Sequence, residues 1–248
     1  MLLAAAKPTI AVSVLLLLLG TRTVMADPND SLMINYAQNG AHQVDVEFGS
    51  QKPSGQSPSG ATTLGVGASV TERWFTEVYG TYLRDSGDTT KFDSAAWINT
   101  LLLTDGQSPI EFALYTEIEY ERDRAAGYKA VIGPLLQGEF GLTTVNLNFL
   151  LHRNYLADFS NPMQLDYQWQ VKRRLSASYE FGVQGFGELG AWNHWAPHDQ
   201  QVHQIGPVFL GKFKLGDEQV IHYNAAVLFD VLDGQRATTF RLQAVYGF

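Results

Sequence analysis

The chain has 248 residues, no cysteine, and 17 basic against 25 acidic residues, which gives a formal net charge of −8. The length suits one sizeable β domain, and the lack of cysteine excludes disulfides and thiolate metal sites. The acidic balance argues against nucleic acid as a partner and against docking on anionic headgroups through a basic patch.

Residues 1–26 have the pattern of a secretory signal peptide. An early charge at Lys7 is followed by an apolar run over 12–19 and by a small-residue cleavage site that ends at Ala26. We expect cleavage there, followed by a periplasmic N-terminal segment over 27–40. Removing the peptide takes away two basic residues and no acid, so the net charge changes from −8 to −10. The remaining chain has no run of 18 apolar residues, which excludes a helical membrane protein and leaves a β-barrel open.

From residue 41 onward, apolar and polar residues alternate, most clearly in MQLDYQWQVK at 163–172. A strand sends successive side chains to opposite faces, so each such segment has one apolar and one polar face. Turn signals separate the segments. The expected strands span 41–51, 60–71, 73–85, 89–103, 109–122, 127–140, 142–154, 162–173, 175–190, 201–214, 218–231 and 236–248. Twelve strands of about ten residues or more predict an all-β fold, a single antiparallel transmembrane β-barrel over 41–248.

The connections also alternate in length. The mostly longer ones follow the odd-numbered strands, at 52–59, 86–88, 123–126, 155–161, 191–200 and 232–235. The tighter ones lie at 72, 104–108, 141, 174 and 215–217. Long loops on one rim and tight turns on the other are typical of membrane barrels, with both termini on the periplasmic rim.

The last strand, TTFRLQAVYGF, carries a family resemblance. Counting back by twos from the C-terminus gives an alternating series of apolar and aromatic residues: Phe248, Tyr246, Ala244, Leu242 and Phe240. This series resembles the final strand of Gram-negative outer-membrane β-barrel proteins. The resemblance implies recognition by the barrel-assembly machinery, location in the outer membrane, and lipid around the barrel. SVTERWFTEVYGTYLRD and IGPLLQGEFGLTTVNLNFL are similar, more loosely, to porin-like transporter barrels whose substrates are mostly unassigned.

The polar faces supply the candidate channel residues. The alternation points these charged side chains inward: Asp45, Glu47, Glu77, Glu111, Glu117, Glu119, Glu121, Lys129, Glu139, Asp166, Lys172, Glu180, Glu188 and Arg241. One interpretation is an acidic pore that favours small polar or cationic solutes, since carboxylates set the field in a narrow channel. The other is a plugged interior in which acids and bases pair across strands, with Glu121 opposite Lys129. Acids outnumber bases too far to be fully paired, which favours the open interior.

An Ile-Gly-Pro motif occurs twice, at 132–134 and 205–207. Because proline cannot donate to the ladder, each site predicts a bulge or a bend that helps to curve the wall.

Other chemistry is weakly indicated. His194, His198 and His203 are candidate metal ligands, but their spacing matches no established site. An aromatic belt with polar loop residues beyond it explains this region more simply. His152 with Asn154 is the strand-borne candidate for hydrolysis, without a serine placed beside it by the pattern. We therefore expect neither enzyme activity nor a cofactor.

The sequence thus favours an outer-membrane channel. The alternative is a closed structural or adhesive barrel whose extracellular loops, chiefly 52–59 and 191–200, bind a ligand. An envelope hydrolase ranks third. At the level of the fold, the alternative is a soluble secreted β-protein.

Overall fold

The structure of this protein is a computed structural model, which describes a closed barrel and most of its connections. It covers Pro28 and residues 42–55, 57–84, 89–104, 106–159, 161–216, 219–231 and 237–248. The expected signal peptide and nearly all of the expected periplasmic segment lie outside these residues, as do the loop segments 86–88 and 232–235.

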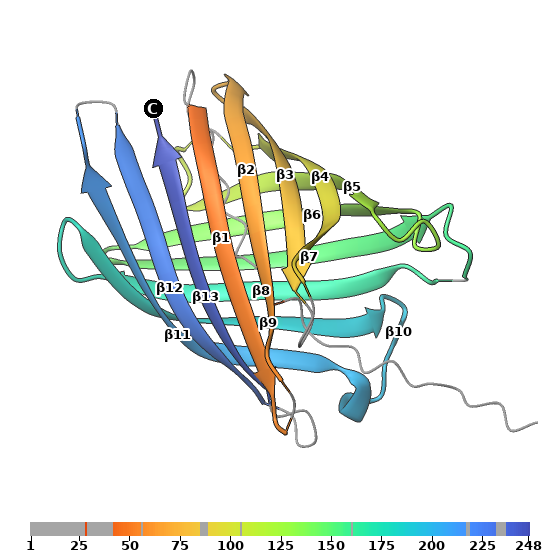
Figure 1. Cartoon of the computed structure of the whole chain (residues 1–248). Helices are drawn as coiled ribbons and strands as arrows, with labels where there is room; N and C mark the ends of the chain where they lie inside the picture. The colour runs from red at the N-terminus through yellow and green to blue at the C-terminus, as the bar shows by residue number, and fades with distance from the viewer. Residues whose placement is uncertain are drawn as a thin grey trace, which may run out of the picture.

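Twelve long strands form an antiparallel ring. Figure 1 shows how they curve around into a barrel. They are β1 (His42–Pro53), β2 (Ser59–Thr71), β3 (Trp74–Arg84), β4 (Lys91–Leu102), β5 (Ile110–Glu121), β6 (Tyr128–Phe140), β7 (Thr143–Tyr155), β8 (Gln164–Arg174), β9 (Tyr179–Ala191), β11 (Val202–Lys214), β12 (Val220–Asp230) and β13 (Ala237–Gly247). Each pairs with its neighbours along the chain, and β8 also pairs with β9. The expected all-β barrel of twelve strands is confirmed.

The ring closes where the two ends of the barrel domain meet, between β1 and β13 (Figure 1). At the rim that carries the termini, the backbone N–H of His42 donates to the carbonyl of Phe248 at 3.0 Å, and the reverse bond measures 2.9 Å. The terminal aromatic strand therefore has both edges paired, which removes the aggregation hazard of an exposed edge.

The two faces of the wall differ as the alternation predicts. On the outer face, Leu147 is 37 % exposed and Phe181 is 49 % exposed, so no second layer of protein covers them. Trp169 on the same face is half-buried because its ring lies over Gly185 of β9, where a Cβ would come within 2.5 Å of the indole nitrogen. This continuous apolar exterior suits hydrocarbon, and the opposite face points into the barrel.

Most strand boundaries agree with the expected ones to within two residues, and two regions differ by more. Strand β9 begins at Tyr179 instead of 175, because the hydroxyl of Ser176 accepts from the backbone N–H groups of Ser178 and Tyr179 at 3.2 Å each and fixes a turn. The expected loop 191–200 contains the two-residue strand β10 (His194–Trp195) and the short 3-10 helix η1 (His198–Gln200). Both elements are too short to leave a periodic signal.

The two Ile-Gly-Pro sites are not bulges. Pairing between β6 and β7 skips Gly133 and Pro134, and pairing between β11 and β12 skips Gly206 and Pro207, but the register is unchanged on either side. A Cβ on Gly133 would collide with the carbonyl oxygen of Phe149. The glycines therefore allow a close approach of two strands, and the expected bend at these sites stays a prediction.

Candidate functional site: the barrel interior

The predicted channel residues lie on the strand faces that point into the barrel, but they are unequally accessible. Among them, Asp45, Glu47, Glu77 and Arg241 are buried, and Glu139 is exposed at the rim. The others are half-buried: Glu111, Glu117, Glu119, Glu121, Lys129, Asp166, Lys172, Glu180 and Glu188. Accessible charged side chains thus occur near both ends of the interior.

An acidic cluster lies near the rim that carries the termini. The amide of Gln243 on β13 donates to Asp45 and to Glu47 on β1, at 2.7 Å each. The hydroxyl of Tyr79 on β3 donates to Asp45 at 3.1 Å, and the amide of Gln43 donates to Glu77 at 3.1 Å. Neutral donors therefore hold these carboxylates in place, which a charge count of the sequence does not predict.

Glycines on β2 make this cluster possible, because β2 separates β1 from β3. A Cβ on Gly65 would lie 2.5 Å from the Tyr79 ring, and one on Gly67 would lie 2.5 Å from the Phe75 ring. Side chains from β3 can therefore lean across β2 and reach β1. The spacing of the two glycines on one face was the available sequence signal, because glycine in a strand marks a close approach.

Ion pairs occupy the opposite side of the interior. Lys129 lies opposite Glu119 at 3.6 Å, and the expectation that it faces Glu121 is wrong because the register pairs Tyr120 with Tyr128. Glu121 instead accepts from the amide of Asn154 at 3.1 Å. Acids and bases therefore pair across strands in part of the interior, as the interpretation of a plugged interior expects.

Two further ion pairs join β7, β8 and β9. Lys172 lies 2.8 Å from Glu180, and His152 lies 3.0 Å from Asp166. Each pair links neighbouring strands, so the charges brace the wall and do not cross the barrel.

Amide side chains line the wall beside these pairs. Asn148 donates to Gln168 at 3.0 Å, and Gln170 donates to Gln184 at 2.9 Å. Neutral amides carry both donors and acceptors, so neighbouring ones can bond to each other. The alternation places the glutamines of β8 on the polar face, and a count of charges alone leaves them out.

Part of the interior is apolar, which the sequence did not predict. The buried side chains of Ala113, Tyr115, Val131, Leu135 and Leu150 pack together on β5, β6 and β7. Both faces of the β6 segment VIGPLL are apolar, so a period of two cannot show which residues point inward. The interior therefore combines acidic, amide and apolar walls.

One contact spans several strands. The guanidinium carbon of Arg241 on β13 lies 4.2 Å from the ring centroid of Phe186 on β9, although β11 and β12 separate these strands in the ring. A contact of this kind crosses a chord of the barrel and narrows the interior. Arginine over an aromatic face is stabilising, more so when it is shielded from water.

Several buried polar atoms of the interior have no hydrogen-bond partner within the described protein. They include Asn146 Nδ2, Asp166 Oδ1, Gln204 Oε1 and Asp45 Oδ1. Buried polar groups are costly without partners, so these atoms require water or a polar solute.

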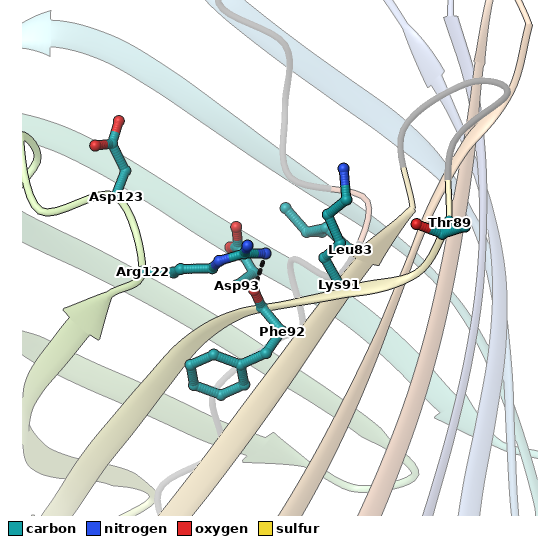
Figure 2. Close-up of a pocket in the computed structure, with 7 residues that line it drawn as sticks. All are labelled: Leu83, Thr89, Lys91, Phe92, Asp93, Arg122 and Asp123. Atoms are coloured by element: carbon teal, nitrogen blue, oxygen red, sulfur yellow. Dashed lines mark hydrogen bonds between the residues drawn. The ribbon is translucent and has the colours of Figure 1, made fainter.

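A pocket of about 280 Å³ lies at the other rim, between the ends of β4 and β5 (Figure 2). Arg122 donates to the carbonyl of Phe92 at 3.3 Å, and its side chain lies beside Asp93 in Figure 2. Lys91 and Asp123 complete the charged lining of the pocket. Charges of both signs surround this pocket, which the sequence did not single out.

The candidate metal ligands do not converge. His203 Nδ1 lies 2.7 Å from the hydroxyl of Tyr167, and its Nε2 lies 2.8 Å from Gln201 Oε1. The rings of His198 and His203 are 6.1 Å apart. Among the described residues, no three histidine or acidic side chains are placed to share a metal ion.

The hydrolase candidates are also separated. His152 pairs with Asp166, whereas the Asn154 amide donates to Glu121 and to the carbonyl of Ala126. Each side chain has its own partners across neighbouring strands, so the two are not joined in one catalytic arrangement.

Comparisons with known proteins agree with this architecture. No protein-family model and no curated protein matches the chain. An outer membrane channel from Pseudomonas putida F1 superposes with a TM-score of 0.62 at 12 % identity, covering 91 % of this chain and 99 % of that one. The NanC porin gives 0.58 at 10 %, covering 81 % and 98 %, and the KdgM porin gives 0.56 at 7 %, covering 82 % and 99 %. At these identities the similarity establishes the fold alone, and the chain has the fold of the outer-membrane porin and channel barrels.

Proposed function

We propose that the protein is a passive outer-membrane channel that admits small polar or cationic solutes through its acidic interior. The observation that supports this most is the set of buried polar atoms without a protein partner, among them Asn146 Nδ2, Gln204 Oε1 and Asp45 Oδ1. A barrel that served only as a structural plug would gain stability by pairing or replacing such groups. A hydrated interior would satisfy these atoms.

The sign of the charge supports the preference for cations. Of the fourteen predicted interior residues, eleven are acidic and three are basic, and each of the two lysines already has an acidic partner. Asp45 and Glu77, in contrast, accept from neutral side chains. Fixed carboxylates of this kind attract cations into a narrow polar channel.

Planar-bilayer recording of the purified protein tests the proposal. Under a KCl gradient we expect discrete conductance steps and a reversal potential on the cation-selective side. Neutralising Asp45 and Glu77 together, as Asp45→Asn and Glu77→Gln, is expected to reduce the selectivity. An absence of conductance, or selectivity for anions in the unmodified protein, would show that the proposal is wrong.

The second candidate is a closed structural or adhesive barrel whose loops bind a ligand outside the cell. The ordered elements β10 and η1, with Trp192 and Trp195 at 54 % and 57 % exposure, favour it. Exposed aromatic side chains on an ordered loop are typical of binding surfaces. Replacing both tryptophans with alanine would then abolish binding of the external ligand to the loops. Neither the unmodified protein nor the variant would conduct ions.

A further inference from the structure

The interior near the terminus rim is electrically asymmetric, and the acidic side lies on β1 and β3. Asp45 is the fourth residue of β1, and Glu77 is the fourth residue of β3. Asp45 is 1 % exposed, and its Oδ1 has no hydrogen-bond partner within the described protein. The same carboxylate accepts on Oδ2 from Gln243 and Tyr79. One oxygen is thus fixed by the wall, and the other is buried without a hydrogen-bond partner within the described protein.

The basic side lies on β8 and β11, near the same rim. Lys172 and Arg174 are in the last three residues of β8, and Lys212 is in the last three residues of β11. Lys172 and Arg174 share one carboxylate, Glu180, at 2.8 and 3.8 Å. Lys212 is opposite His222 in the ladder. Three cations with one acid leave this side positive.

The two sides face each other across the barrel. In the ring of twelve strands, β2 lies six strands from β8 in either direction, so the carboxylates that flank β2 are opposite Lys172. Strands β1 and β3 both begin at the terminus rim, where β8 ends, so the groups also share one end of the barrel (Figure 1). A field therefore runs across the channel from the β8–β11 side to the β1–β3 side.

We propose that this end of the interior is a binding site for small zwitterionic solutes, of the amino-acid type. The ammonium group of the solute faces Asp45 and Glu77, and its carboxylate faces Lys172 and Lys212. This inference rests on the proposed channel function and names its substrate class. A solute that carries both charges gains from both walls at once, whereas a simple cation gains from one wall and is repelled by the other.

Liposome swelling with matched solutes tests the inference. Alanine is zwitterionic, and lactamide is an uncharged molecule of nearly the same size and shape. We expect the unmodified channel to pass alanine faster than lactamide. Lys172→Gln with Lys212→Gln, and separately Asp45→Asn with Glu77→Gln, should each lower the alanine-to-lactamide ratio by roughly two- to fivefold, the size of a partly solvated charge contact.

Matched controls separate a local effect from a general charge effect. Glu72→Gln in the turn between β2 and β3, and Arg173→Gln on the outer face of β8, remove exposed charges at the same rim and should leave the ratio unchanged. Reversal potentials provide a second measurement, because the two pairs of substitutions should shift ion selectivity in opposite directions. The variant with Asp45→Asn and Glu77→Gln changes buried residues and can fail to assemble. The variant with Lys172→Gln and Lys212→Gln then provides the test by itself, because Lys212 is exposed and its replacement disturbs the fold little.

The possible failures are distinguishable. A channel that conducts ions and passes lactamide, but whose alanine-to-lactamide ratio is the same in the unmodified protein and in the variants, would overturn the zwitterion site and leave the channel function intact. A protein that gives neither conductance nor swelling would overturn both proposals.

Discussion

The hydroxyl of Tyr79 on β3 donates a 3.1 Å hydrogen bond to Asp45 on β1, across the whole width of β2. The contact exists because Gly65 presents no side chain between them. Because this bond positions one carboxylate of the interior, the backbone of β2 indirectly controls the electrostatics of the proposed channel.

Gly65→Ala should therefore destabilise the barrel and disturb the acidic cluster. The new Cβ would lie 2.5 Å from the Tyr79 ring, so the ring must move and release Asp45. We expect a loss of about 1–3 kcal/mol in unfolding free energy, from overpacking and the broken hydrogen bond. Gly80→Ala is the control, since a Cβ there meets nothing within 4 Å. Equal unfolding midpoints for the two variants would contradict the argument.

Arg241→Ala should widen the channel. The contact between Arg241 and Phe186 crosses the interior, so its removal should raise single-channel conductance and cation selectivity together. The lost cation–π contact should also lower stability by about 1–2 kcal/mol. Arg173→Ala removes an exposed arginine that lies opposite Phe181 on the outer face, and it should leave the conductance unchanged. A conductance that stays the same or falls in Arg241→Ala would show that this pair does not narrow the path.

The outer face gives a prediction that depends on depth in the membrane. Val66 is central in β2, whereas Val70 lies near its end, at the irregularity between Ser69 and Thr71, and the two are 61 % and 49 % exposed. Val66→Arg should cost about 2–4 kcal/mol, and Val70→Arg about 0–1 kcal/mol, because the cost of arginine falls from the bilayer centre to the interface. Reversible unfolding from lipid vesicles measures both values. Similar costs at the two positions would contradict the membrane placement of β2.

The wall could be predicted from the sequence far better than the interior could. The alternation of 163–172 gave the two faces of β8 correctly, because a period of two has one structural consequence. The pairing of Lys129 depended on the register across a turn, and an error of two residues changed its partner from Glu119 to Glu121. A shift of two residues keeps every side chain on its face, so the pattern could not detect it.

The apolar patch in the interior and the contact of Arg241 with Phe186 were beyond the sequence for two other reasons. The patch lies on neighbouring strands, but both faces of the β6 segment VIGPLL are apolar, so the alternation does not show which residues point inward. The contact depends on how the closed ring brings strands together, because β11 and β12 separate its partners. Periodicity describes one strand at a time and carries no information on such distances. The expected recognition of the C-terminal strand by the assembly machinery stays a prediction.

The close approach of neighbouring strands at the Ile-Gly-Pro sites provides the strongest test of how the wall is built. A Cβ on Gly133 would collide with the carbonyl oxygen of Phe149, and one on Gly206 with that of Val227. These are backbone atoms, so the neighbouring strand must move as a whole, and we expect alanine at either site to cost at least about 3 kcal/mol and to impair assembly. Gly247→Ala is the matched control, because its Cβ would meet the nearest atom at 3.8 Å. Gel migration of boiled and unboiled samples reports the assembled fraction. Full assembly of both the Gly133→Ala and the Gly206→Ala variants would mean that the strands can separate there without penalty, and that these glycines do not determine the curvature of the barrel.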